Sequence, residues 1–309
     1  MILENKMKTT KQRAPKFKRK PEQLGGVRLQ ERDIGIIRAV HDYRFLNSDQ
    51  IKFLTDGSAQ GISRRLQKLF HHRFLDRPPS QVVVALAGTP KMVYALGDRG
   101  ADLLAEKSGM DRGKIKWREK NREVKDRHIQ HTLMISDFRI CLESALVITP
   151  NARLLFWKKE NRKELRDSVY IEDQRGPHRK IPIVPDSFFG IKDTRPEKPT
   201  AHFFLEADRS TMANDRFFRK MRAYWIWNKR EKGHTKKFGI KAFRVLTITK
   251  SEQRKQNLRK ITKGADNRQK GSYMFWFTSE ANYNIQKPES ILGPIWQTPV
   301  DDSFHSLLE

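Results

Sequence analysis

Two acidic residues interrupt an apolar stretch, 201–208, whose composition otherwise predicts a buried strand. Because residues two apart in a strand point to the same face, Glu206 and Asp208 are expected on one side of a sheet. Buried carboxylates cost free energy unless a cation neutralises them. Asp186, in the stretch VPDSFF, adds a third acid if its strand pairs with 201–208. The pattern therefore requires a cation at this place.

Two kinds of cation would satisfy these acids. One is a divalent metal, and Mg²⁺ fits because it takes oxygen ligands, keeps several waters and needs only one or two carboxylates. Bound there, it would lower the pKa of a water and stabilise charge on a phosphodiester. The other is a protein cation: Arg209 follows the acids directly, and Lys220 lies on the next predicted helix in one stripe with Arg216 and Tyr224. The residues leave both alternatives open.

Strands and helices that alternate along the chain would position these side chains. Apolar runs predict strands at 152–157, 180–191, 201–208, 242–249 and 273–278. Helical periodicity predicts helices at 128–147, 215–229 and 251–262. Pro185 has no N–H to donate, so strand pairing is interrupted beside Asp186, which is expected to share a face with Val184 and Phe188. Together these elements predict an α/β or α+β domain, a mixed sheet flanked by helices.

The order of these residues resembles that of the PD-(D/E)XK nuclease superfamily. Pro185-Asp186 lies on one strand, a carboxylate pair on the next, and a Lys-x-x-x-Tyr pattern on the following helix. The resemblance implies that Asp186 and Glu206 bind metal, with Mg²⁺ as the cofactor if the nuclease-like site is active. One departure is that the superfamily's catalytic lysine would fall at position 208, which is Asp208 here. The resemblance then gives Lys220 the charge-stabilising role and makes Asp208 a further ligand or a residue that positions water.

A longer resemblance covers about residues 31 to 300 and is to the plasmid replication-relaxation family. The chain carries PDSFF, LEADRST, KMRAY, VLTITKSEQRKQNLR and PESILGPIWQTP in the family's order. The resemblance implies a winged-helix N-terminus, DNA binding, and a role in the replication or maintenance of a bacterial plasmid or mobile element. It establishes no reaction, so two alternatives stay open: a Mg²⁺-dependent endonuclease, and a non-catalytic regulator that only holds DNA or a partner.

The N-terminal part predicts a winged helix. Helical patterns begin at Glu31, at Ser48 as an N-cap, and at Ile62, and the run 80–96 then predicts a hairpin. In this arrangement the third helix enters the major groove of DNA. The residues expected off its buried stripe, and therefore available to DNA, are Ser63, Arg64, Gln67, Lys68 and His71. Such faces also contact proteins, so both kinds of partner fit this helix.

The charge of the chain favours a polyanionic partner. Lys and Arg outnumber Asp and Glu by 63 to 36, which gives a net charge of +27. Further candidate DNA contacts are Arg77, Lys91, Lys229, Lys232 and Lys236. The expected partners are double-stranded DNA and replication or mobilisation proteins of the same element, and no RNA-binding signature is present. The sequence leaves open whether the chain forms a homodimer.

Composition also predicts how the chain is divided. The expected segments are a basic disordered arm at 1–27, a winged-helix domain at 28–110, a charged linker or helix at 111–127, a nuclease-like domain at 128–300 and a tail at 301–309. A single cysteine, Cys141, excludes a disulfide within the chain. His128 and His131 are expected to be core or capping residues because His131 heads an apolar stripe. No apolar run has membrane length, so a bacterial, cytoplasmic, DNA-associated protein is expected.

Overall fold

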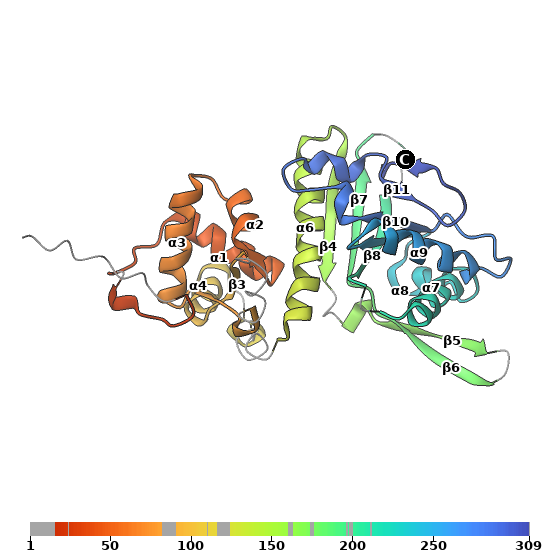
Figure 1. The fold of residues 1–309 in the computed structure, drawn as a ribbon, viewed down its shortest axis with the longest axis horizontal. Coiled ribbons are helices and arrows are strands. Elements are labelled where there is room, and N and C mark those ends of the chain that lie inside the picture. Colours follow the sequence, from red (N-terminus) through yellow and green to blue (C-terminus); the bar gives the residue numbers. More distant parts are fainter. Residues whose placement is uncertain are drawn as a thin grey trace, which may run out of the picture. The chain divides into compact units, whose positions relative to one another are not determined.

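The structure is a computed structural model that describes residues 16–308, except for 24, 82–90, 110, 116–123, 160–162, 174–175, 196, 198–199 and 211. The chain divides into two compact units, Met1–Leu133 and Met134–Glu309. Helices and mixed sheets give it an α+β fold, as the sequence predicts (Figure 1). Within the described part of the chain, no helix combines the length and the apolar character needed to cross a bilayer.

The first unit combines helices with a small antiparallel sheet (Figure 1). Its elements, in chain order, are α1 (Glu31–Tyr43), β1 (Leu46–Asn47), α2 (Ser48–Phe53), α3 (Ala59–His71), β2 (Leu75–Asp76), β3 (Val93–Leu96) and α4 (Asp98–Ser108). Strand β3 lies between β1 and β2 and is antiparallel to both. The three predicted helices are present. The first arm of the predicted hairpin falls within 82–90, outside the described residues.

Local sequence explains where these helices begin and which face they bury. The predicted N-cap of the second helix, Ser48, is wrong by one residue, because Asn47 accepts hydrogen bonds from the backbone N–H groups of the first turn of α2. Ser58 caps α3 in the same way. The core of the unit also takes in Ile129 and Leu133, which pack with Phe45. These two residues belong to α6 (Asp126–Ile148), so the first unit ends inside a helix.

The second unit is built on a seven-stranded mixed sheet in the order β12-β11-β10-β9-β8-β7-β4 (Figure 1). Its strands are β4 (Ala152–Lys159), β7 (Ser187–Asp193), β8 (Thr200–Asp208), β9 (Arg244–Thr249), β10 (Phe275–Ser279), β11 (Trp296–Gln297) and β12 (Phe304–His305). Neighbours β8, β9 and β10 are parallel, and the other pairs are antiparallel. The carboxyl ends of these three parallel strands therefore lie at the same end of the sheet.

Helices cover both faces of this sheet (Figure 1). Alternate residues of β8 show which helix covers which face, since Phe203 and Leu205 pack in the cluster that contains α6, and Phe204 packs in the cluster that contains α7 (Asn214–Lys229) and α9 (Glu252–Thr262). Because Glu206 and Asp208 follow Phe204 at spacings of two, they face α7 and α9. The short helix α8 (Gly233–Phe238) follows α7.

The predicted single strand at 180–191 is wrong, because the chain forms two strands there. The first, β6 (Gly176–Ile183), pairs with β5 (Asp167–Asp173) in a separate two-stranded sheet, and only the second, β7, joins the main sheet. Pro185 lies in the break, where its missing N–H cannot serve a ladder. Asp186 therefore does not share a strand face with Val184 and Phe188. It lies in the turn that enters β7.

Short 3₁₀ helices are also present, among them Pro21–Gln23, Arg112–Lys114, Lys163–Leu165, Lys263–Ala265, Glu280–Asn282 and Pro288–Leu292. The last of them belongs to the stretch PESILGPIWQTP. Ile291 and Trp296 from that stretch are fully buried in the cluster that contains α6, and the Trp296 indole N–H donates to the Ile291 carbonyl over 3.1 Å. This closing motif is thus part of the core.

Candidate functional site

The structure brings Asp186 beside strand β8. The Asp186 N–H donates to the Leu205 carbonyl over 3.0 Å, and its carboxylate accepts from the Ala207 N–H over 2.7 Å. These two bonds hold Asp186 against the residues on either side of Glu206. The geometry follows from the pairing of β7 with β8, in which Ser187 lies opposite Leu205. Two of the three predicted acids are thus neighbours at the carboxyl end of β8.

Glu206 receives two side chains from α7. The Lys220 ammonium donates to one carboxylate oxygen, and the Tyr224 hydroxyl donates to the other over 2.7 Å. Lys220 and Tyr224 are four residues apart, so both lie on the helix face that is turned to β8. The third residue of the predicted stripe, Arg216, is exposed at the start of α7. Glu206 itself is 4% exposed, so its charge is satisfied by these groups and not by bulk water.

The electrostatic environment makes Glu206 an unusual acid. Burial raises the pKa of Glu206 to about 7; the positive charge of Lys220 opposes the rise, and the negative charge of Asp186 adds to it. The pKa of Tyr224 is also raised well above its usual value, by burial first and then by the charge of Glu206. A carboxyl with a pKa near neutrality exchanges its proton under physiological conditions. Glu206 can therefore act as an acid or a base, or lose its proton to solvent when a cation binds its carboxylate.

Asp208 is held by an arginine from α9. The Arg254 guanidinium donates from Nε to one carboxylate oxygen over 2.8 Å and from Nη2 to the other over 3.0 Å. The Ser210 N–H adds a third bond, of 2.7 Å. Both side chains of the ion pair are largely buried. The structure therefore places Asp208 in a fork-shaped ion pair, and its role as a metal ligand or as a residue that positions water stays a prediction.

The cations of this site differ in part from those expected. Lys220 donates to Glu206, as expected if a protein cation neutralises the acids. Burial raises the pKa of Glu280, and the positive charge of Arg209 opposes that rise. Arg254, which lies 46 residues from Asp208, is not among the cations predicted from the sequence. The one available signal was its position in the stretch VLTITKSEQRKQNLR, which marks it without giving a partner.

The metal prediction now depends on the pair Asp186 and Glu206. Among the described residues, no group of three or more His, Cys, Asp or Glu is arranged to hold a metal ion. Mg²⁺ can be held by two carboxylates together with waters and substrate phosphate, so the donor set of this pair fits the ion.

His128 and His131 stack on each other with ring centroids 6.5 Å apart, and the ring of His128 contacts Arg44 over 2.6 Å.

On α3 the candidate DNA contacts separate into two groups. Ser63 and Arg64 are exposed, and Gln67 and Lys68 are partly exposed. The expected placement of His71 off the buried stripe is wrong: it is 1% exposed, and its Nδ1 accepts from the Lys20 N–H over 2.9 Å. Burial also lowers the pKa of His71, because the charged ring would lose its hydration. The first four residues form the available face of the helix.

Two other candidates in the first unit have partners within the protein. Arg77 is 8% exposed, donates to the Tyr94 hydroxyl over 3.2 Å and lies over the Phe70 ring, so it is a packed residue and not a surface contact. Lys91 is exposed and pairs with Asp49 over 2.8 Å. In the second unit Lys229, Lys232 and Lys236 are all exposed around the turn from α7 to α8. These three lysines keep their charges at the surface.

The fold and the site define a two-unit α+β protein that carries a buried carboxylate–lysine–tyrosine cluster. The family model of replication-relaxation proteins matches residues 37–239. The chain therefore belongs to the replication-relaxation family, and membership indicates a role in plasmid or mobile-element replication, with DNA or replication-related partners. The matched range contains Asp186, Glu206, Lys220 and Tyr224 and ends before Arg254. Searches among curated proteins and among solved structures find no match.

Proposed function

We propose that this protein binds double-stranded DNA in the replication or maintenance of a plasmid or other mobile element, with its first unit acting as a winged helix. The observation that carries this proposal is the exposed face of α3, with Ser63 and Arg64, on a chain of net charge +27. An arginine in the major groove can form two hydrogen bonds with a guanine edge. The exposed lysines 229, 232 and 236 would neutralise phosphates.

The dependence of binding on salt tests this proposal. Each Lys or Arg on a phosphate releases counterions, so affinity for duplex DNA should fall steeply as salt rises. Arg64→Ala should reduce the preference for one sequence over another, because it removes a base contact. Lys232→Ala combined with Lys236→Ala should weaken binding to all sequences alike. An affinity that is flat between about 50 and 200 mM salt would exclude this mode of binding.

A second candidate function is metal-dependent hydrolysis of phosphodiester bonds. One observation favours it: the negative charge of Asp186 raises the pKa of Glu206, and the positive charge of Lys220 lowers it. Asp186 and Glu206 are the residues that would hold Mg²⁺. The ion would supply an activated water and neutralise charge on a phosphodiester. Lys220, which lies beside Glu206, would stabilise the negative charge of a bound substrate. The Tyr224 hydroxyl would fix the orientation of the Glu206 carboxylate. The competing function is a regulator that holds DNA without cutting it.

Two measurements separate these functions. A plasmid-nicking assay with Mg²⁺ or Mn²⁺ should show cleavage by the wild type and none by Asp186→Asn. Metal should also raise the melting temperature of the wild type but not of Glu206→Gln, with a larger shift at pH 8 than at pH 6, because metal competes with the proton on Glu206. Glu289→Gln, at an exposed position, is the matched control. If the wild type shows neither cleavage nor a melting shift at millimolar metal, the regulator that holds DNA without cutting it is the remaining function.

A further inference from the structure

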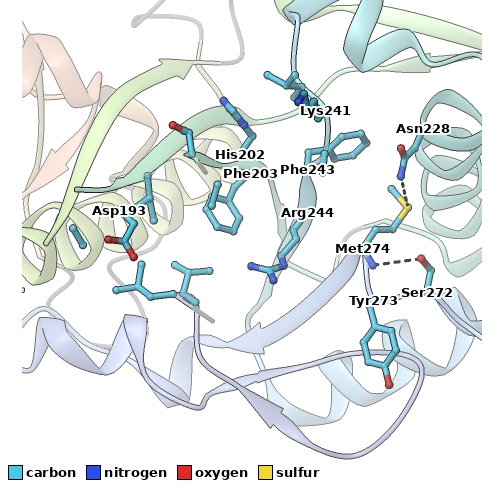
Figure 2. A pocket seen from close by; sticks show the side chains of 18 of the residues that line it. Asp193, His202, Phe203, Asn228, Lys241, Phe243, Arg244, Ser272, Tyr273 and Met274 are labelled. Carbon is cyan, nitrogen blue, oxygen red and sulfur yellow. Dashed lines mark hydrogen bonds between the residues drawn. The ribbon is translucent and has the colours of Figure 1, made fainter. Parts of the chain in front are cut away.

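A cavity lies in the second unit at the end of the sheet where β8 and β9 begin (Figure 2). It has a volume of about 1110 Å³, comparable with the largest ordinary small-molecule sites. Thr200, at the start of β8, lines it, whereas Glu206 and Asp208 lie at the other end of the same strand. The cavity is therefore distinct from the carboxylate site, and it shares one residue, Lys229, with the proposed duplex contacts.

Most of the charged residues that line this cavity are positive. Four are Lys or Arg and one is Asp193, which forms an ion pair with Arg195. Lys229 and Lys241 are exposed at its rim. Arg244 lies among the labelled side chains of Figure 2, with its guanidinium carbon 4.2 Å from the centre of the Trp276 ring. The rim therefore attracts an anion, and the stacked guanidinium offers a flat face.

The remaining lining includes aromatic and apolar side chains together with the polar residues Asn151, Thr200, Asn228 and Ser272. Tyr273 is 56% exposed, and its hydroxyl donates to Asp301 over 2.8 Å, which orients the ring. His202 lies further along the wall, and burial lowers its pKa because the charged ring would lose its hydration. Phe243 and Met274 form part of the buried floor (Figure 2). The cavity thus combines a cationic rim with surfaces on which a planar ring can stack.

We propose that this cavity binds a nucleotide, with the base against Tyr273 and Arg244 and the phosphate at Lys229 and Lys241. A purely apolar ligand would desolvate the rim cations without pairing them, and inorganic phosphate alone would leave the aromatic and apolar wall uncovered. A nucleotide satisfies both parts. It comes either from the free nucleotide pool or from an unpaired stretch of a DNA strand, because both present a base with an attached phosphate.

Binding to the full chain without divalent metal tests the proposal. The probes are dAMP, dTMP and a single-stranded dT8 oligonucleotide, titrated by calorimetry. Lys241→Glu and Tyr273→Ala should each lower the affinity about tenfold or more, since one reverses the charge at the phosphate and the other removes a stacking surface. Lys260→Glu makes the same charge change at an exposed position on α9 that does not line the cavity, and it should bind as the wild type does.

The outcomes identify the source of the ligand or overturn the proposal. Saturable binding of the mononucleotides, weakened in both variants, assigns the cavity to free nucleotides. Binding of dT8 alone, weakened in the same way, assigns it to an unpaired strand. No saturable binding of any probe at millimolar concentration, or equal binding by the wild type and both variants, overturns the proposal. These titrations contain no duplex DNA, so a failure of duplex recognition by α3 is distinguished from a failure of this site.

Discussion

At the scale of single residues, Glu206 and Asp208 solve the same problem in different ways. Both are buried acids on one face of β8. Asp208 is neutralised by the two-pronged donation of Arg254, while Glu206 lies between the positive charge of Lys220 and the negative charge of Asp186. The first arrangement gives a carboxylate a two-pronged cation partner, and the second lets a carboxylate take up a proton near neutral pH. Of the two acids, Glu206 is therefore the one suited to proton transfer near neutral pH.

The raised pKa of Glu206 predicts how stability depends on pH. Because the pKa of Glu206 is about 7 in the folded state and 4.5 ordinarily, the folded protein keeps a proton that the unfolded chain loses. That contribution to the free energy of unfolding is present below about pH 4.5 and is lost as pH rises through about 7. The wild type should lose up to about 1.4 kcal/mol per pH unit in this window relative to Glu206→Gln.

Urea denaturation of both proteins between pH 5 and pH 8 measures this difference. The variant carries a neutral amide at all these pH values, so the titration of this group is absent from its curve. Glu289→Gln, at an exposed position, should follow the wild type. Parallel curves for the wild type and Glu206→Gln would show that residue 206 is charged across the whole range.

The Asp208–Arg254 pair predicts a large loss of stability on removal of one partner. Arg254→Ala leaves the Asp208 carboxylate, whose side chain is 3% exposed, without its cation, and the free energy of unfolding should fall by about 3–5 kcal/mol. Adding Asp208→Asn should restore part of the loss, because no buried charge is then unpaired. Arg216→Ala, at an exposed position on α7, should change stability by no more than about 0.5 kcal/mol. An equally small effect of Arg254→Ala would mean that water reaches Asp208.

At the scale of elements, the turn from α7 to α8 depends on a close approach. A Cβ atom added at Gly233 would lie 1.9 Å from the Trp227 indole nitrogen, and Trp227 is a fully buried residue of the core on that face. Gly233→Ala should therefore destabilise the second unit by about 1–3 kcal/mol. At Gly264 the nearest atom to such a Cβ is 3.4 Å away, on Phe218, so Gly264→Ala should change little. Thermal denaturation of the two variants compares them directly.

The sequence predicts the elements whose apolar pattern is long, and it misses those that have none. The apolar run of β8 and the periodic faces of α3 and α7 are visible because several core contacts repeat at a fixed spacing. Strands β11 and β12 have two residues each, too few for a period. The pairing of Asp208 with Arg254 could not be predicted either, since no local spacing links residues that the fold brings together from different elements.

At the scale of the whole molecule, the prediction concerns which part of α6 stabilises the first unit. Ile129 is fully buried in a cluster with Phe45 and Val93, so Ile129→Ala should destabilise the first unit by about 2–5 kcal/mol. Val147, on the same helix, is 85% exposed, and Val147→Ala should have little effect. Hydrogen exchange of the α1 amides reports on the first unit alone. Unchanged exchange in Ile129→Ala would place the boundary of the unit before α6.

The division of α6 between two cores also sets an order for synthesis on the ribosome. Residues up to Leu133 belong to the first unit and those from Met134 to the second, so the chain emerging through residue 108 already contains α1 to α4 but lacks two residues of their core. Domains otherwise fold as their own segment leaves the ribosome, N-terminal first. Here the core of the N-terminal unit is complete only when the opening turns of α6 have also been made, and the later turns of the same helix pack in the next unit.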